Sequence, residues 1–269
     1  MSAVLDLIAA GVKPMIGMVQ LKPLAGSSRY GGESLESVLE HALLQTAILV
    51  DAGFPVVMVQ NLGDLPVASA ATANQVAWMA RITHEVRRAS ALPVGLNLLE
   101  NDVDAMFAVA TAAGADFVRI KVYVGAMVTP GGIETGRAFE AIRARTTLRA
   151  GGIGIFADIH DRTGVPLASA GLADDIHTAV AIGGTDGIVL TGRSQAETLE
   201  MLAIGRQSFP KLPILAGGGA NATNVAKFSA LADGAIVSSA LKAANTPFGE
   251  LDIALARDFM RVAGGTGLA

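Results

Sequence analysis

The chain has 269 residues, a formal net charge of −4 and no cysteine; 51% of its residues are hydrophobic and only 16% are charged. A chain of this length and apolar content can bury a large core, which excludes intrinsic disorder. The lack of cysteine excludes a disulfide scaffold and a thiolate metal site. Without an excess of basic residues, general electrostatic binding to nucleic acid is not expected.

The high apolar content raises the question of a membrane segment, because a spanning helix needs roughly 20 uninterrupted apolar residues. The richest stretch, residues 43–59, is interrupted by Asp51 and Pro55 among others. Residues 1–17 lack the basic segment of a signal peptide and carry Asp6 where such a peptide is apolar. We therefore expect a cytoplasmic protein without a membrane span. Its apolar excess is expected in buried strands and in the interface of a homo-oligomer.

One pattern recurs along the chain: a helix-like stretch ends near small residues, and a short apolar run follows. Asp51-Ala52-Gly53 precedes the run 56–59, and Ala113-Gly114-Ala115 precedes the run 117–122. Glycine after a helix is a common stop signal. Continuous apolar runs are typical of parallel strands that are buried on both faces. The pattern therefore predicts alternating helices and buried parallel strands.

Eight strands and eight helices are predicted in this way. The strands cover residues 15–19, 56–59, 94–98, 117–122, 153–159, 187–190, 214–216 and 235–237. The helices cover residues 35–50, 70–88, 102–113, 136–149, 173–182, 194–209, 221–231 and 251–262, with Ser34 and Asp102 as N-caps. This alternation predicts an α/β fold, a single (β/α)8 TIM barrel with parallel strands over residues 1–269. The competing open sheet would show a dinucleotide fingerprint after its first strand, and residues 17–32 show none.

Active sites of such barrels lie at the C-terminal ends of the strands, so the residues that finish each strand are the candidates. Polar residues follow the first three strands and the sixth, and their amides, carboxylates and hydroxyl could bind substrate hydroxyls. These predicted substrate-binding residues are Gln20, Gln60, Asn61, Asp64, Asn97, Asn101, Asp102 and Thr191. The alternative is a rim that is hydrogen-bonded only to itself.

The fourth and fifth strands carry the charged candidates for catalysis. Arg119, Lys121 and Tyr123 are spaced by two, so all three are expected to point into the barrel. Lys121 could form a Schiff base, or it could be a fixed cation. Asp158 and His160 could be an acid–base pair or two metal ligands. No cofactor is predicted, and a divalent metal such as Mg²⁺ is left open, because oxygen-rich sites leave little trace in a sequence.

The last two strands indicate a phosphate site. The seventh strand runs into Gly217-Gly218-Gly219 and the eighth ends in Ser238-Ser239. Glycines allow backbone N–H groups to approach an anion, and a helix beginning near Asn221 would add a favourable dipole. The alternative is a tight turn without a ligand. The glycine-rich segment 128–136 is expected to be a mobile lid or a disordered loop.

Taken together, these segments resemble the BtpA/SgcQ family of predicted TIM-barrel proteins over nearly the whole chain. The matching segments are Gly17-Met18-Val19-Gln20-Leu21-Lys22-Pro23-Leu24, Gln60-Asn61-Leu62-Gly63-Asp64-Leu65-Pro66, Asn97-Leu98-Leu99-Glu100-Asn101-Asp102, Gly114-Ala115-Asp116-Phe117-Val118-Arg119-Ile120, Gly125-Ala126-Met127-Val128-Thr129, Ala157-Asp158-Ile159, Thr191-Gly192 and Asp233-Gly234-Ala235-Ile236-Val237. The resemblance implies a barrel of the ribulose-phosphate-binding type. Family members are described as nucleosidases or sugar-metabolic enzymes, and one branch is linked to photosystem I assembly.

The chain departs from the family pattern at several of these positions. The family usually has histidine at the position of Gln20, glutamate at that of Gln60 and asparagine at that of Lys121. A Lys-His pair is expected where Arg162-Thr163 stands, serine where Gly218 stands, and glycine at Ser238. The two glutamines cannot titrate, so acid–base roles at those positions are not carried over.

The expected function is an enzyme that acts on a small phosphorylated, sugar-like metabolite by acid–base chemistry of the lyase or isomerase type. Asp158 is the expected base or acid, with Arg119 and Lys121 stabilising negative charge. The alternatives are cleavage of an N-glycosidic bond, as in a nucleosidase, and a non-catalytic binding or assembly protein related to the photosystem I branch.

Overall fold

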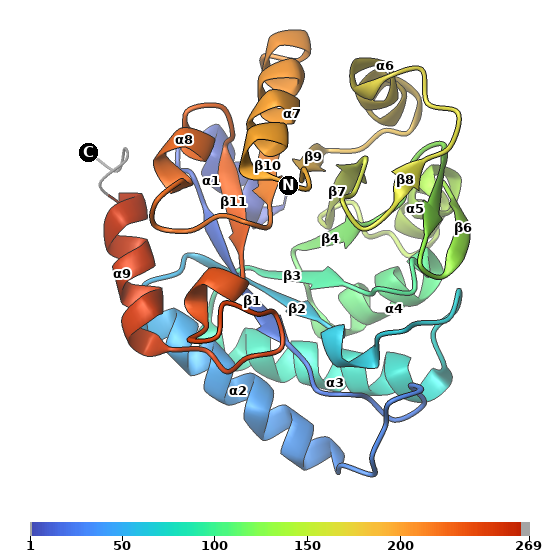
Figure 1. Cartoon of the computed structure of the whole chain (residues 1–269). Coiled ribbons are helices and arrows are strands. Elements are labelled where there is room, and N and C mark those ends of the chain that lie inside the picture. Colours follow the sequence, from blue (N-terminus) through green and yellow to red (C-terminus); the bar gives the residue numbers. More distant parts are fainter. Residues whose placement is uncertain (1, 265–269) are drawn as a thin grey trace.

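Eight parallel strands close into a barrel in the computed structural model, which describes residues 2–264 (Figure 1). The strands are β1 (Met15–Gln20), β2 (Val56–Gln60), β3 (Val94–Asn97), β4 (Phe117–Ile120), β7 (Gly154–Ile159), β9 (Gly187–Leu190), β10 (Ile214–Gly217) and β11 (Gly234–Val237). β11 pairs in parallel with β1 and so closes the circle. The predicted fold class is confirmed, and each predicted strand ends within two residues of the observed one.

Helices follow the strands and pack around the barrel. They are α2 (Leu35–Asp51), α3 (Ala73–Ser90), α4 (Val103–Ala113), α5 (Ala138–Thr147), α6 (Leu172–His177) with the π-helical turn Thr178–Ile182, α7 (Gln195–Ser208), α8 (Val225–Ser229) and α9 (Ile253–Gly264). Ser34 and Asp102 are the predicted N-caps, since their side chains accept hydrogen bonds from the backbone N–H groups of Ser37 and Ala105. Within residues 2–264, no helix has both the length and the hydropathy to span a bilayer.

The interior of the barrel is a solid apolar core that is closed at its N-terminal end by a helix, α1 (Ala3–Ala9). Sequence analysis did not predict this helix. Val4 is fully buried in the same cluster as Met58, Phe117 and Phe156. The ring of Phe117 occupies the space beside Gly95, where any Cβ atom would overlap it. Only the C-terminal end of the barrel is therefore left for binding and chemistry.

A repeated aspartate supports the N-terminal ends of the strands. Asp116, Asp186 and Asp233 each directly precede a strand, β4, β9 and β11 respectively. Each carboxylate accepts a hydrogen bond from a backbone N–H at the start of the neighbouring strand; the three donors are Val94, Ile155 and Ile214, at 2.8–2.9 Å. These three aspartates thus have a structural role at the end of the barrel opposite to the site.

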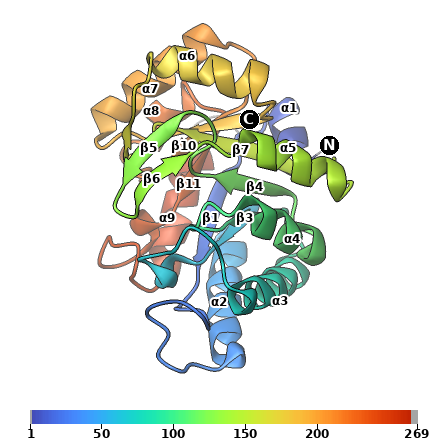
Figure 2. The same ribbon diagram turned by 90° about the vertical axis from the view of Figure 1, so that its right-hand side faces the viewer.

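The segment expected as a lid or a disordered loop is instead a β-hairpin, so the expectation of disorder is wrong. β5 (Ala126–Thr129) and β6 (Gly132–Thr135) pair antiparallel, and β8 (Val165–Pro166) joins the other edge of β5. Figure 2 shows this small sheet on the side of the barrel, next to α5. The cross-strand pairing orders the segment and forms one wall of a pocket that is described below.

Candidate active site

The inward-pointing residues at the C-terminal ends of the eight strands form one polar ring above the apolar interior. From β1 to β11 they are Gln20, Gln60, Asn97, Arg119, Asp158, Thr191, Gly217 and Ser238. Each lies two residues beyond an inner-cluster side chain or, for Asn97, beyond Gly95. Alternation along a strand sends such pairs to the same side. All eight were predicted as site residues, and we refer to them as the polar ring.

A buried ion pair crosses the polar ring. Arg119 Nε donates to Asp158 Oδ2 and Arg119 Nη2 donates to Asp158 Oδ1, both at 2.7 Å. Burial raises the pKa of Asp158 above its ordinary value, and the charge of Arg119 opposes that shift. Burial alone would lower the pKa of Arg119, but Asp158 raises it. The ring therefore holds a permanent cation and a carboxylate that burial makes more basic.

A second ion pair lies beside the first. Lys121 Nζ lies 2.5 Å from Asp161 Oδ2, and Asp161 is 3.9 Å from Arg119 Nη2. Although burial acts to raise it, the charges of Lys121 and Arg119 hold the pKa of Asp161 well below its usual range. A carboxylate thus holds the amine of Lys121, which favours the fixed cation over the Schiff base. Asp161 was not predicted as a site residue, because it follows the end of β7, where strand alternation no longer applies.

The sequence also left Lys242 without a role, and the structure places it against the polar ring. Its side chain is buried, and Nζ donates to Gln20 Oε1 and to the carbonyl of Pro247, both at 2.5 Å. Burial lowers the pKa of Lys242 to about 8, against the opposing charge of Glu250. Its position five residues after β11 was the available signal.

Four of the predicted substrate-binding residues make hydrogen bonds within the framework of the barrel. Asp64 is fully buried and accepts hydrogen bonds from Leu24 N, Asn61 Nδ2 and Gln75 Nε2 at 2.7–2.8 Å. Asn101 bonds the backbone of Val122 in both directions. Asp102 caps α4 and accepts from Ala71 N. Asn61, Asp64, Asn101 and Asp102 therefore all have hydrogen-bond partners in the framework, and their predicted contact with substrate hydroxyls stays a prediction.

Tyr123 and His160 do not join the polar ring, which corrects two further expectations. Strand β4 ends at Ile120, and Tyr123 turns outward to donate a hydrogen bond to the carbonyl of Gly183 at 2.5 Å. Burial raises the pKa of the Tyr123 hydroxyl to about 12. His160 has a left-handed backbone, with φ of 56°, just after β7. Its Nε2 lies 2.7 Å from Asp175 Oδ2, so the expected pair with Asp158 does not form.

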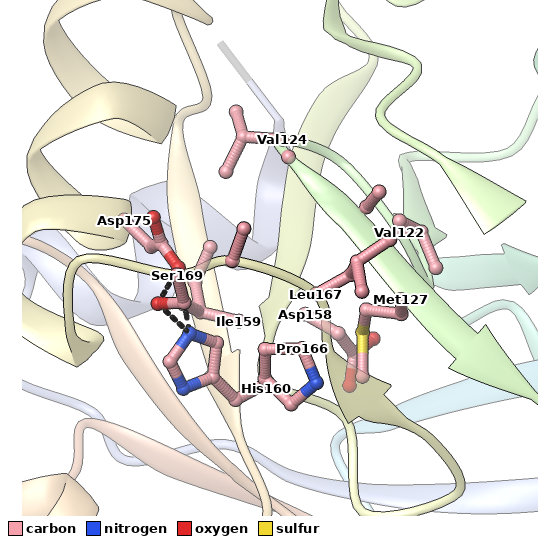
Figure 3. Close-up of a pocket in the computed structure, with 13 residues that line it drawn as sticks. Val122, Val124, Met127, Asp158, Ile159, His160, Pro166, Leu167, Ser169 and Asp175 are labelled. Atoms are coloured by element: carbon pink, nitrogen blue, oxygen red, sulfur yellow. Dashed lines mark hydrogen bonds and ion pairs between the residues drawn. The ribbon is translucent and has the colours of Figure 1, made fainter. Parts of the chain in front are cut away.

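Asp158 and His160 nevertheless line the same pocket, which has a volume of about 50 Å³. Figure 3 shows Val122, Val124 and Met127 on one side of it, and His160, Ser169 and Asp175 on the other. Ser169 Oγ donates to Asp175 Oδ2 at 2.6 Å and contacts the same nitrogen of His160 at 3.2 Å. Serine and aspartate therefore share one imidazole nitrogen, which is not the arrangement of a catalytic triad.

The glycine turn after β10 has the geometry that only glycine adopts readily. Gly218 and Gly219 have φ of 75° and 74°. Arg162 Nη2 lies 3.3 Å from the position that a Cβ of Gly218 would occupy. The predicted helix over 221–231 is wrong in extent: α8 begins only at Val225 and has five residues. It contributes no N-terminal dipole at the turn.

Two buried hydroxyls border this turn without a hydrogen-bond partner among the described residues. They are Thr191 Oγ1 and Ser238 Oγ. A Cβ at Gly217 would overlap Thr191 Oγ1, so that hydroxyl lies directly against the turn. Buried polar groups nearly always have partners. The hydroxyls of Ser2, Ser27 and Thr83 also lack partners within residues 2–264, so it is the place of Thr191 and Ser238 at the C-terminal end of the barrel that makes these two candidates for contact with a ligand. Ser239, also predicted for phosphate, instead begins the short turn Ser239–Leu241.

Metal ligands are not gathered anywhere in the part of the chain that the structure describes. No three histidine, aspartate or glutamate side chains of residues 2–264 are placed so that they could hold an ion. The acidic residues of the site, Asp158 and Asp161, are occupied by Arg119 and Lys121. A role for Mg²⁺ stays untested.

Comparisons with known proteins agree with this architecture. The BtpA family profile matches residues 11–265. A Thermococcus kodakarensis protein described as uncharacterised is 35% identical, with 93% of this chain and 95% of that protein aligned. The photosystem I biogenesis protein BtpA of Synechocystis is 32% identical (85% and 80% aligned). The SgcQ protein of Escherichia coli, described as a putative sgc region protein, is 25% identical (86% of both chains).

Solved structures share the fold at low sequence identity. Thiamine phosphate pyrophosphorylase from Pyrococcus furiosus superposes with a TM-score of 0.58 at 16% identity, covering 97% of this chain and all of that one. N-(5'-phosphoribosyl)anthranilate isomerase from the same organism has a TM-score of 0.55 at 17% identity, covering 94% and 99%. At such identities the likeness shows the barrel fold alone.

Proposed function

This chain belongs to the BtpA family, and from that premise we propose that it is an enzyme that acts on a small phosphorylated, sugar-like metabolite. The observation that carries the proposal is the pair of unpartnered hydroxyls, Thr191 Oγ1 and Ser238 Oγ, beside the Gly217–Gly219 turn. A phosphate group has oxygen acceptors for both hydroxyls and for the backbone N–H of Gly219, whereas the N–H of Gly218 already donates to the carbonyl of Ile236. The guanidinium of Arg162 would neutralise part of its charge.

The chemistry we propose is proton transfer next to a carbonyl, of the lyase or isomerase type. Asp158 would accept the proton, since burial raises its pKa and so makes the carboxylate a better base. Arg119 is held against Asp158 by two hydrogen bonds, and Lys121 lies beside it. These two cations would stabilise the negative charge that develops on the carbonyl oxygen. The two solved barrels are named for phosphorylated compounds, thiamine phosphate and N-(5'-phosphoribosyl)anthranilate, which supports the substrate class.

Ligand-induced stabilisation tests the phosphate site. The panel consists of inorganic phosphate, ribose 5-phosphate and glucose 6-phosphate, with ribose and glucose as unphosphorylated partners. A ligand at 100 times its Kd adds about 2.7 kcal/mol of stability, which corresponds to roughly 5–10 °C in Tm for a chain of this size. We expect shifts with the phosphorylated compounds only. A panel in which no phosphorylated compound raises the Tm would overturn the phosphate site.

Single-atom variants show whether the two hydroxyls carry the binding. Ser238→Ala and Thr191→Val each remove an unpartnered oxygen, so the Tm of the free protein should change little while the phosphate-induced shift falls. Ser2→Ala is the matched control, because Ser2 Oγ is also buried without a partner but lies near Gly154 at the other end of the barrel. Equal shifts in all three variants would place the anion elsewhere.

Proton abstraction is tested separately by exchange. Carbonyl-containing sugar phosphates that shift the Tm are incubated in D2O, and deuterium uptake next to the carbonyl is followed by NMR. Asp158→Asn should abolish uptake while phosphate-induced stabilisation persists. Uptake that survives in Asp158→Asn would remove Asp158 from the proposed role. Release of a free base from a nucleoside or nucleotide, with no exchange, would favour N-glycosidic cleavage, in which the same carboxylate activates water.

The relationship to the Synechocystis photosystem I biogenesis protein supports a second candidate, a non-catalytic assembly protein on a retained barrel. The absence of titrating side chains at Gln20 and Gln60 fits that candidate. It predicts that a partner retained in a pulldown survives the double change Asp158→Asn and Lys121→Met. Loss of a measured turnover in the same double variant favours the enzyme instead.

A further inference from the structure

A continuous chain of hydrogen bonds runs along one wall of the polar ring, from β11 to β4. Lys242 Nζ donates to Gln20 Oε1 at 2.5 Å, and Gln20 Nε2 donates to Gln60 Oε1 at 3.5 Å. Gln60 Nε2 donates to Asn97 Oδ1 at 2.6 Å, and Asn97 Nδ2 donates to the carbonyl of Arg119 at 2.8 Å. Four side chains and five strand ends are thereby linked in one direction.

The lysine determines that direction. An ammonium group has three donors and no acceptor, so Gln20 must turn its amide oxygen toward Lys242. Its amide nitrogen then faces Gln60, and the same constraint passes to Gln60 and Asn97. The backbone of Gln20 is also held, because Gln45 of α2 bonds both its N–H and its carbonyl, at 3.1 and 2.9 Å. Lys242 therefore fixes the orientation of all three amides, because each hydrogen bond constrains the next one.

A wall with this polarity offers donors to a ligand. Every amide oxygen in the chain already accepts a hydrogen bond from the preceding nitrogen. Each amide nitrogen uses one N–H in the chain and keeps a second one. Gln20 and Gln60 retain 8% and 7% exposure, whereas Asn97 is fully buried. Contact with a ligand thus falls to Gln20 and Gln60, and Lys242 and Asn97 act as positioning residues behind them.

The charge at this wall is not compensated within the described residues. Lys242 is 3% exposed, and its two hydrogen-bond partners, Gln20 Oε1 and the carbonyl of Pro247, are neutral oxygens. Glu250, whose charge acts to raise the pKa of Lys242, is paired with His41 and largely exposed. A buried cation without a counterion is costly, and an anionic ligand group nearby would offset that cost. Asp158 and Asp161 cannot serve, because Arg119 and Lys121 hold them.

We propose that Gln20 and Gln60, oriented by Lys242, recognise a carboxylate, so that the substrate is a phosphorylated carboxylic acid. This inference rests on the proposed phosphate site and adds a second anionic group to the ligand. It refines the expectation that these amides bind sugar hydroxyls: a hydroxyl oxygen can also accept from the free N–H groups, but a carboxylate has more acceptor sites and its charge offsets that of Lys242. The phosphate would lie at β9–β11, and the carboxylate beside it at β1–β2, because β11 pairs with β1 in the closed barrel.

Matched pairs of ligands test the carboxylate directly. 6-Phosphogluconate and glucitol 6-phosphate differ only in a carboxylate against a hydroxymethyl group, and 3-phosphoglycerate and glycerol 3-phosphate form a shorter pair. Kd values are measured by isothermal titration calorimetry at pH 7. We expect the acid of the better-fitting pair to bind at least about tenfold more tightly than its alcohol, the scale of one charge-assisted hydrogen bond. Equal affinities within both pairs would overturn the proposal.

Variants separate a positioning role from a merely structural one. Lys242→Met removes the donors, and we expect it to abolish the preference for the acid while the alcohol binds as before. Lys242→Arg keeps a donor-only cation and should restore part of the preference. Gln60→Glu places a carboxylate in the wall and should reverse it. A preference that persists in both Lys242→Met and Gln60→Glu contradicts the proposed wall.

Failure of the phosphate site is distinguishable from failure of this inference. Ser238→Ala should weaken the acid and the alcohol of a pair by the same factor, because it touches only the phosphate end. Gluconate and glucitol carry no phosphate and report on the carboxylate wall alone. Binding of gluconate without any effect of phosphate would retain the wall and reject the phosphate site. Binding of neither gluconate nor any of the phosphorylated acids would reject the wall.

Discussion

Removing one member of the buried Arg119–Asp158 pair is expected to destabilise the barrel strongly. In Asp158→Asn, Asp161, at 3.9 Å, is the one carboxylate within 4 Å of the Arg119 guanidinium that remains among residues 2–264. Breaking a buried pair by removing one partner costs about 3–5 kcal/mol, because the other charge stays buried and uncompensated. Arg119→Met likewise leaves Asp158 buried without its partner, and it should lower the free energy of unfolding by a similar amount. The double variant, which leaves neither charge, should lose clearly less than the sum.

An exposed pair of equal length provides the control. Arg257 Nη2 and Asp51 Oδ2 are also 2.7 Å apart, but their side chains are 59% and 62% exposed. Arg257→Met should cost less than about 1 kcal/mol, because water screens the charges and replaces the lost contact. The two ion pairs have the same length and differ in burial, so a difference in stability loss between Arg119→Met and Arg257→Met reports the effect of burial.

Urea unfolding followed by far-UV circular dichroism gives the free energies for the cycle. The expected coupling between Arg119 and Asp158 is at least about 2 kcal/mol, beyond the additivity error of roughly 0.5 kcal/mol for independent sites. Additive effects of the two single changes would refute the reasoning. So would a loss in Asp158→Asn as small as that in Arg257→Met.

Three further outcomes follow from the geometry. Gly95→Ala should lower the free energy of unfolding by about 1–3 kcal/mol, measured by differential scanning calorimetry, because its Cβ would overlap the ring of Phe117. Adding Phe117→Leu should recover part of that stability. An unchanged stability in Gly95→Ala would mean that the interior has room at this position. In the folded protein the pKa of Lys242 is about 8, below the 10.5 of a free lysine, so between these pH values the unfolded chain binds more protons than the folded one. The stability of wild type relative to Lys242→Met should therefore increase as pH rises from 8 to 9.5, measured by urea unfolding at both pH values. A stability difference that stays constant would contradict this prediction. Ser34→Ala should lower the stability by about 1 kcal/mol, because it removes the side chain that accepts a hydrogen bond from Ser37 N at the start of α2. A thermal unfolding curve that matches wild type would show that the cap contributes nothing to stability.

Strand alternation predicted the inward-pointing site residues correctly within the strands, but not beyond their ends. A buried strand sends every second residue inward, so Asn97, Arg119 and Asp158 could be assigned to the interior from their spacing to glycine or apolar residues. The same rule failed for Tyr123, because β4 ends at Ile120 and the chain then turns. It also failed for His160, whose left-handed backbone follows the last residue of β7.

Features that depend on contacts between distant residues could not be predicted in this way. Asp161 joins the site only because Lys121, 40 positions earlier, reaches it from the neighbouring strand end. Lys242 meets Gln20 across 222 positions, and only the closure of the barrel between β11 and β1 brings them together. Asp64 has the same residue type as a catalytic carboxylate, but three donors from separate elements make it part of the framework.

Apolar runs and glycine stops were enough to predict the strands, their order and the inward side of each as far as the strand extends, because burial on both faces of a parallel sheet leaves this local record in the sequence. The N-terminal plug α1 also left such a record, in the apolar residues Val4, Leu7 and Ile8, which were not interpreted as a helix. The tertiary structure decided which polar residues are free to meet a ligand. That depends on hydrogen-bond partners supplied from elsewhere in the chain, which leave no periodic pattern in the sequence.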